Sequence, residues 1–231
     1  MPHFKRILSL FLALCLCFGF VSVSAVAADG SGSLGNFAKN NVWNDSLFDD
    51  VAETDWFNEN IRSVYEYGLM VGKGEGSFAP SASVSVAEIL TVAARLHAVY
   101  HTGSDAFAPT DPWYACYAAY CVENGIVSSL PEEMNAPAAR GLVAEILCAA
   151  LPQTEYEAIN SVKDGSIPDV AADDVFGPAV YRLYRAGIMV GNDEAGTFAP
   201  YSDVKRSEVA AILTRIIDKP LRKNITLPVS V

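Results

Sequence analysis

Apolar residues recur along this chain in short stripes of helical period, and a glycine follows each stripe. Within a stripe the apolar side chains stand at i, i+4, i+7 and i+8 or close to it, which is typical of one buried helix face. A glycine just past such a helix suits the left-handed backbone that ends it. The pattern therefore predicts three short helices, with stripes at Phe57–Tyr65, Tyr114–Val122 and Phe176–Tyr184 and end glycines at Gly68, Gly125 and Gly187.

A second type of stripe follows each of these helices after a loop. In the first copy Ser85 stands three residues before Glu88, the spacing of a capping box that opens a helix. In the third copy Glu208 remains but Lys205 occupies the cap position, so Asp203 is the predicted cap. The middle copy has the sequence Ala139-Arg140-Gly141-Leu142 there, without either half of the box.

The loops show that these helix pairs form an array. Phe78-Ala79-Pro80 returns 120 residues later as Phe198-Ala199-Pro200, with a weaker copy of the whole unit in between. No unit is large enough to bury its apolar stripes alone, so the three units should share one core. We expect an all-α fold of three helix–loop–helix repeats, at residues 47–100, 105–152 (the degenerate copy) and 165–219.

The ends of the chain differ from the array. Residues 1–27 have the features of a secretory signal peptide: Lys5 and Arg6, a long apolar run, and Ala25-Val26-Ala27 before Ala28. Residues 28–46 begin Gly/Ser-rich and are predicted to be a flexible linker. Residues 220–231 are predicted to be a frayed or extended tail. We expect an exported chain with no stable membrane insertion after signal cleavage.

Composition narrows the choice of ligand. The exported chain has a formal charge of −13, because the loss of Lys5 and Arg6 leaves 14 basic against 27 acidic residues. Binding of nucleic acid through a general basic face is thereby excluded, and an anionic ligand would need a local basic site. The exported chain keeps three cysteines, an odd number that predicts buried thiols and no disulfide framework.

The repeats resemble S-layer homology (SLH) domains. The resemblance is carried by the Phe48-Asp49-Asp50-Val51 and Ile167-Pro168-Asp169-Val170 openings, by Trp56 and Trp113 at the start of a first helix, and by the Gly-Ser/Thr-Phe-Ala-Pro loops. Lys205-Arg206-Ser207-Glu208 is similar to the motif that opens the second helix of these domains. The resemblance implies a pseudo-threefold helical domain that holds exported proteins non-covalently on the wall of Gram-positive-type bacteria.

The resemblance also implies a ligand and its site. The implied partner is a secondary cell-wall polysaccharide with a pyruvylated sugar, whose carboxylate is gripped in grooves between repeats. Arg140 and Arg206 match the motif arginine, Val86 replaces it in the first repeat, and Trp56 and Trp113 are expected to stack on a sugar face. Gly68, Gly125 and Gly187 match the positions of backbone donors.

Other readings of these residues stay open. The tryptophans can fill the core, and the arginines can be solvated residues that pair with acids. The alternative function is a structural scaffold with a decayed sugar site, whose partner is another surface protein. An enzyme is not expected, since almost no residues remain outside the array, and neither is a cofactor or a metal: His97 and His101 stand four apart but have no third ligand.

Overall fold

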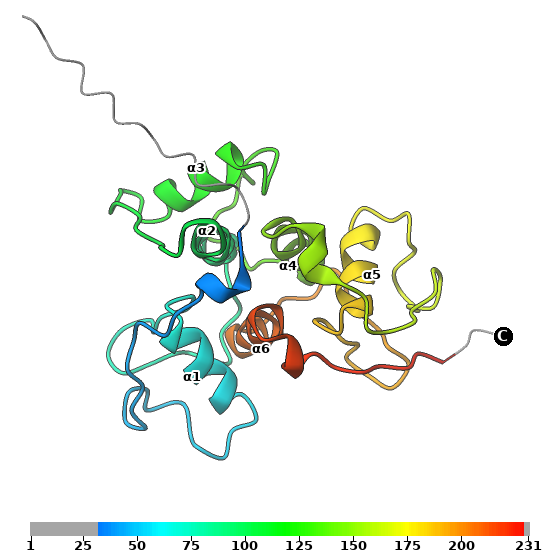
Figure 1. Ribbon diagram of the computed structural model, residues 1–231, viewed down its shortest axis with the longest axis horizontal. Coiled ribbons are helices and arrows are strands. Elements are labelled where there is room, and N and C mark those ends of the chain that lie inside the picture. Colours follow the sequence, from blue (N-terminus) through cyan, green and yellow to red (C-terminus); the bar gives the residue numbers. More distant parts are fainter. Residues whose placement is uncertain (1–31, 229–231) are drawn as a thin grey trace, which may run out of the picture. The chain divides into compact units, whose positions relative to one another are not determined.

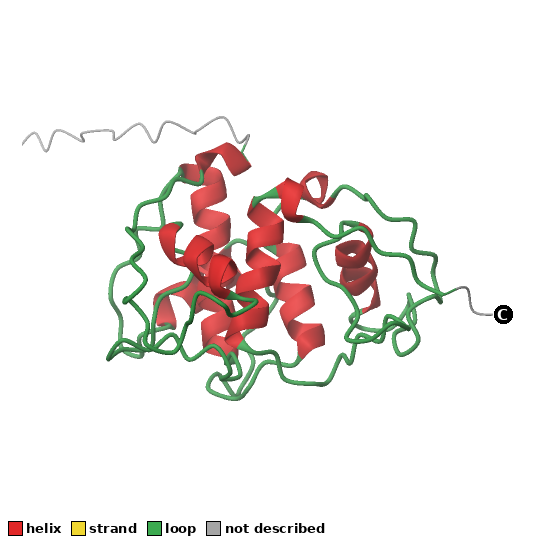
Figure 2. Ribbon diagram, turned by 90° about the horizontal axis from the view of Figure 1, so that it is seen from below, coloured by secondary structure: helices red, strands yellow, loops and turns green. Residues whose placement is uncertain are grey.

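The computed structural model describes residues 32–228, and this part of the chain contains helices and loops without a β-sheet (Figure 2). The all-α prediction is confirmed. The elements are the short 3-10 helices η1 (Leu34–Asn36), η2 (Gln153–Tyr156) and η3 (Lys219–Leu221), and the helices α1 (Asn58–Glu66), α2 (Val86–Thr102), α3 (Ala115–Glu123), α4 (Arg140–Ala149), α5 (Gly177–Arg185) and α6 (Arg206–Ile217).

The second helices of the repeats lie at the centre and the first helices lie outside them (Figure 1). The packing is interleaved: α3 packs on α2, α5 packs on α4, and α1 packs on α6. Each outer helix therefore covers the central helix of a different repeat. The core is shared as the sequence predicts, but by exchange between repeats, which the pattern of stripes does not reveal.

A ring of backbone hydrogen bonds joins the starts of the three central helices. The first amide of each helix donates to the carbonyl four residues before the start of another: Val86 to Ala136, Arg140 to Ser202 and Arg206 to Ala82, at 3.0, 2.8 and 2.9 Å. The second amides donate in the same cyclic order, Ala87 to Met134, Gly141 to Pro200 and Ser207 to Pro80. These amides have no partner within their own helix, so the ring satisfies them while it joins the repeats. The pseudo-threefold relation of the whole repeats stays a prediction.

The loop phenylalanines plug the core. Phe78 and Phe198 are fully buried. Asp50 accepts hydrogen bonds from the amides of Phe78 and Ala79, and Asp169 accepts the equivalent pair in the third repeat. The carboxylate of the opening motif thus holds the tight turn that inserts the ring, in which Ala79 has a positive φ of 57°.

The predicted caps are partly correct. Ser85 and Glu88 form both hydrogen bonds of the capping box, at 3.2 and 2.9 Å. The prediction for Asp203 is wrong: its carboxylate accepts a hydrogen bond from the Ser83 hydroxyl of the first repeat. Glu208 accepts the Lys205 amide, and α4 has no side-chain cap.

The predicted flexible linker is wrong where the structure describes it, from residue 32 to 46. Ser33 donates its amide to Tyr100, and Asn40 and Asn41 both donate theirs to Glu66. The Asn41 side chain donates to the Tyr65 carbonyl at 2.7 Å. The segment is held because these asparagines donate hydrogen bonds to the carbonyls of Glu66 and Tyr65 in the last turn of α1, where carbonyls run out of partners within the helix.

The tail was predicted to be frayed or extended, and residues 222–228 follow η3 without helical structure but are bound to the fold and not frayed. Arg222 donates to the carbonyls of Glu155 and Arg215, and Lys223 donates its amide to Gly187. Asn160 bonds the tail on both sides, to the Lys223 carbonyl at 2.9 Å and to the Ile225 amide at 2.9 Å. Ile225 and Leu227 pack on the core, so the third repeat gains apolar contacts from the tail.

Two further features complete the fold. Among residues 32–228 no helix has the length and apolar character needed to cross a bilayer. Among residues 32–228, Cys121 and Cys148 are buried free thiols, as predicted, whereas the free thiol Cys116 is only half-buried. The signal peptide predicted for residues 1–27 lies outside the described residues.

Asn160 and Asn41 provide a matched test of the tail contact, because both donate to the end of an outer helix and only Asn160 also binds the tail. We expect Asn160→Ala to lower the free energy of unfolding by about 2 kcal/mol and Asn41→Ala by about 1 kcal/mol. Urea unfolding followed by circular dichroism measures both. Equal losses would show that the tail contact contributes little.

Candidate functional site

The two predicted arginines occupy the same position in two repeats. Arg140 is the first residue of α4 and Arg206 is the first residue of α6. The hydrogen-bonded ring brings each side chain under the loop of a neighbouring repeat, where 7% of Arg140 and 4% of Arg206 remain exposed. Neither is the solvated helix residue of the alternative reading.

The two predicted tryptophans are surface residues. Trp56 is 64% exposed and Trp113 is 50% exposed, so they do not fill the core. Each stands two residues before an outer helix and lines a pocket that also contains one of the arginines: Trp113 with Arg206, and Trp56 with Arg140. The structure thus combines the four predicted residues into two grooves.

The first of these, the Arg206 groove, has a volume of about 230 Å³ and is lined by Leu69, Met70, Val71, Gly72, Lys73, Glu88, Thr91, Val92, Arg95, Trp113, Tyr117 and Arg206. The groove is lined by the loop and the central helix of the first repeat, by Trp113 of the second repeat and by Arg206 of the third. Three cations face one carboxylate in it, so the groove is a local basic site on an acidic chain.

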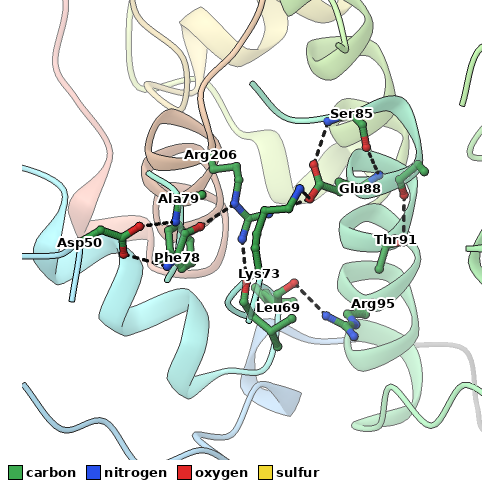
Figure 3. A network of polar contacts seen from close by, with 12 residues as sticks. Asp50, Leu69, Lys73, Phe78, Ala79, Ser85, Glu88, Thr91, Arg95 and Arg206 are labelled. Atoms are coloured by element: carbon green, nitrogen blue, oxygen red, sulfur yellow. Dashed lines mark hydrogen bonds and ion pairs between the residues drawn. The ribbon is translucent and has the colours of Figure 1, made fainter. Parts of the chain in front are cut away.

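Each nitrogen of the Arg206 guanidinium donates a hydrogen bond inside the protein (Figure 3). It donates to the carbonyls of Val71 and Phe78, at 2.6 and 2.9 Å, and to the Glu88 carboxylate at 3.1 Å. It also lies 4.7 Å from the centre of the Phe78 ring. Arg206 therefore ties the third repeat to the first.

Glu88 connects this arginine to the rim of the groove. Its carboxylate accepts the Ser85 amide and, at 2.8 Å, the Lys73 ammonium. Burial by itself would raise the pKa of the Glu88 carboxyl, but the bonds from Lys73 and Ser85 and the charge of Arg206 outweigh it and hold that pKa below 4.5. Glu88 is consequently an anion built into the groove.

The second site, the Arg140 groove, has a volume of about 170 Å³ and is lined by Trp56, Arg140, Met189, Val190, Gly191, Asn192, Glu208, Ala211, Ile212 and Arg215. Its residues match those of the Arg206 groove position by position. The clearest difference lies in the loop, where Asn192 replaces Lys73.

This replacement leaves Arg140 with few partners. The Asn192 amide donates to the Phe198 carbonyl at 3.3 Å, which is the equivalent of the carbonyl that Arg206 binds in the other groove. Arg140 donates to the Val190 carbonyl at 3.1 Å, and its buried Nε has no hydrogen-bond partner within residues 32–228. A buried, partly unsatisfied guanidinium favours the binding of an anion that supplies the missing acceptors.

The charges in the Arg140 groove also favour the binding of an anion. Burial lowers the pKa of the Arg215 guanidinium, and the charge of Arg140 lowers it further. Burial also lowers the pKa of Arg140, against the opposing charge of Glu208. No ion pair within 4 Å joins Arg140 to a carboxylate in the part of the chain that is described. Two cations therefore repel each other in a pocket that an anion would stabilise.

The third equivalent position has apolar residues in place of these charges. In the two grooves the first arginine begins one central helix, and the glutamate and the second arginine are the third and tenth residues of another. The corresponding residues at the third position are Val86, which begins α2, and Leu142 and Ala149, the third and tenth residues of α4. Val175, two residues before α5, replaces the tryptophan. Such a surface cannot bind a carboxylate through charge.

The three predicted glycines lie outside both groove linings. Gly68, Gly125 and Gly187 have φ of 73°, 69° and 69°, as the end of a helix requires. Their amides donate to the carbonyls of Tyr65, Val122 and Tyr184. Their role as ligand donors stays a prediction, and Gly72 and Gly191 are the glycines that line the grooves.

Two arginines of the grooves were missed by the sequence analysis. Arg95 and Arg215 stand 120 residues apart, the same period as the loops, and this spacing was the signal that could have found them. Each donates to the first carbonyl of its loop, Arg95 to Leu69 and Arg215 to Ile188. They form the floor of their grooves.

The histidine pair has a structural role. His97 Nδ1 lies 2.9 Å from the Tyr120 hydroxyl, and the ring of His101 stacks 4.3 Å away. Burial and the neighbouring His101 lower the pKa of His97 to about 4. Within the described residues no group of three or more potential ligands is placed to hold a metal.

Comparison with protein families identifies the S-layer homology domain at residues 47–89 and 166–210. These ranges contain the first and third repeats up to the start of their central helices. No curated protein matched the chain. The assignment of residues 105–152 to the same family stays a prediction.

The two arginines should differ in their effect on stability. Arg206→Ala removes a buried ion pair and two further hydrogen bonds, so we expect a loss of about 3 kcal/mol in the free energy of unfolding. Arg140→Ala removes one hydrogen bond and an unsatisfied charge, so we expect a change of about 1 kcal/mol or less. Urea unfolding at pH 7 measures both, and equal losses would contradict the difference in bonding.

The Glu88 carboxylate should make stability depend on pH. Its pKa is lower in the folded chain than in the unfolded chain, so its contribution is complete above 4.5 and is lost as the pH falls through the lowered folded value. We expect Glu88→Gln to be less stable than the parent at pH 7 and the gap to shrink below pH 4.5. A gap that is constant between pH 7 and pH 3 would refute this role.

Proposed function

We propose that this protein, which contains S-layer homology domains at residues 47–89 and 166–210, attaches to the bacterial cell wall by binding an acidic wall polysaccharide without a covalent bond. S-layer homology domains are non-catalytic modules that associate with cell-wall polymers at the cell surface. The finer proposal is that the recognised group is a carboxylate, such as that of a pyruvylated sugar on a secondary polysaccharide. The wall is that of a Gram-positive-type bacterium.

One observation carries the proposal: the buried Arg140 guanidinium lines a pocket together with the exposed Trp56, and its Nε has no hydrogen-bond partner among residues 32–228. A carboxylate accepts two parallel hydrogen bonds from a guanidinium. The indole of Trp56 offers an apolar face for the sugar ring that carries the carboxylate. Charge and shape for one acidic sugar residue are thus present together.

The two grooves are proposed to differ in affinity for the anion. In the Arg206 groove a ligand carboxylate has to compete with Glu88, which lies 3.1 Å from the guanidinium. In the Arg140 groove the equivalent Glu208 is not within ion-pair distance of the arginine, among the residues described. We therefore assign the principal anion subsite to Arg140, with Arg215 beside it.

A structural scaffold is the second candidate. It is favoured by the apolar third position, where Val86 and Val175 replace arginine and tryptophan, and by the internal bonds that occupy Arg206. In this case another surface protein is the partner. The same binding experiment separates the two candidates, because a scaffold does not need the free guanidinium.

The test is co-sedimentation of residues 28–231 with purified walls of the source organism. Native walls are compared with walls stripped of secondary polysaccharide and walls from which pyruvate has been removed. We expect binding to native walls that falls about 30-fold with Arg140→Ala, corresponding to about 2 kcal/mol for hydrogen bonds to a charged group. Arg62→Ala is the control, because Arg62 lies on the surface outside both grooves.

Each outcome has a meaning. Equal binding to all three wall preparations would exclude the carboxylate as the recognised group. Binding to native walls that survives in the Arg140→Ala, Arg206→Ala double variant would favour the scaffold. No binding by the parent to any wall would reject the anchor altogether.

A further inference from the structure

The Arg206 groove continues into a second pocket, which has no equivalent among the residues that line the Arg140 groove. The second pocket has a volume of about 270 Å³ and shares Trp113 and Tyr117 with the groove. Its remaining lining comes from the loop that follows α2, residues 107–110. We call the three rings of this pocket, Phe107, Trp113 and Tyr117, the aromatic shelf.

The shelf is held in place by packing beneath it. The Phe107 ring lies 4.6 Å from the Tyr117 ring and 5.1 Å from the Tyr120 ring. Arg95, from the floor of the groove, lies 5.3 Å from the centre of the Tyr117 ring and donates to its hydroxyl at 3.2 Å. The shelf is therefore formed before any ligand binds, which lowers the entropy cost of binding.

The chemistry of the shelf differs from that of the groove. Among the described residues, no charged side chain lines the second pocket. Of its two hydroxyls, that of Thr110 donates to the Pro112 carbonyl, and that of Tyr117 accepts a hydrogen bond from Arg95. The surface offers aromatic faces without a charge, which suits the apolar C–H face of a neutral sugar ring and not an anion.

The Arg140 groove lacks this extension. Asn60 stands where the second repeat has Tyr117, four residues after the tryptophan. The side-chain oxygen Oδ1 of Asn60 accepts a hydrogen bond from the Thr214 hydroxyl at 3.1 Å. Trp56 is the one aromatic residue in that groove's lining. The two grooves thus offer different surfaces beyond the arginine.

We propose that the aromatic shelf binds an uncharged sugar residue next to the residue held in the Arg206 groove. The inference rests on the proposed function, that the grooves bind a wall polysaccharide. The Arg206 groove then takes at least two linked sugars and recognises the polysaccharide mainly by its sugar faces. The Arg140 groove takes one acidic residue and recognises its charge.

The test uses oligosaccharides released from the source organism's wall polysaccharide and separated into fragments of one, two and four sugar residues. Isothermal titration is carried out in the Arg140→Ala chain, so that the Arg206 groove is the site observed. We expect the affinity to rise about tenfold from one residue to two, as burial of roughly 50 Å² of apolar surface would give. Phe107→Ala should abolish the rise and leave binding of the one-residue fragment unchanged.

A second variant guards against a change in folding. Phe107→Leu keeps most of the volume beneath the loop but removes the ring, and it should lose the same rise while its circular dichroism spectrum matches the parent's. A rise that persists in both variants overturns the shelf and leaves the proposed anchor intact.

A neutral probe tests the shelf even if no wall fragment binds. N,N′-diacetylchitobiose carries no charge, and the chain has three tryptophans, Trp43, Trp56 and Trp113, whose indole signals can be resolved by NMR. We expect this disaccharide to shift the Trp113 signal, with Trp56 unchanged, and Phe107→Ala to reduce that shift. The absence of a Trp113 shift with both the disaccharide and the fragments overturns the inference, whereas the proposed function is tested by the wall experiment.

Discussion

The structure depends on the ring of backbone hydrogen bonds that joins the starts of α2, α4 and α6. A helix start has amides that no residue of the same helix can satisfy. Here each start gives two of them to the loop of another repeat, in cyclic order. This single arrangement closes the array and places Arg140 and Arg206, the first residues of α4 and α6, in grooves between repeats. The geometry of the candidate site and the cohesion of the repeats thus rest on the same bonds.

Because the arginines of the two grooves occupy equivalent positions, a change of one loop residue is enough to give them different hydrogen-bond partners. Lys73 draws Glu88 toward the rim, where the carboxylate also meets Arg206. Asn192 cannot do this, and its amide takes the Phe198 carbonyl instead. Equivalent arginines therefore have opposite roles, one as a buried tie between repeats and the other as a cation with acceptors to gain. At the third equivalent position the arginine itself is absent, because Val86 stands in its place.

Much of the candidate site could be predicted from the resemblance to S-layer homology domains. That resemblance implied Arg140, Arg206, Trp56 and Trp113, and the structure brings them together in pairs. Arg95 and Arg215 could have been found from their period of 120 residues. The difference between the two arginines could not, because it depends on which side chain reaches a given carbonyl. The linker was misjudged because its polar composition hides Asn41, whose side chain binds the end of α1. The tail was misjudged because Asn160, which holds it, lies far from it in the sequence.

The amino-acid sequence by itself determined the helices, the number of repeats, the plugging phenylalanines and the arginine at the start of two central helices. These features depend on residues within a few positions of one another, so their periodicity and capping are visible in the chain. The tertiary structure alone decided that outer helices cover the central helix of another repeat, that each groove takes residues from three repeats, and that Phe107 extends one of them. These features depend on contacts between residues far apart in the chain, whose partners are chosen only when the ring of hydrogen bonds closes.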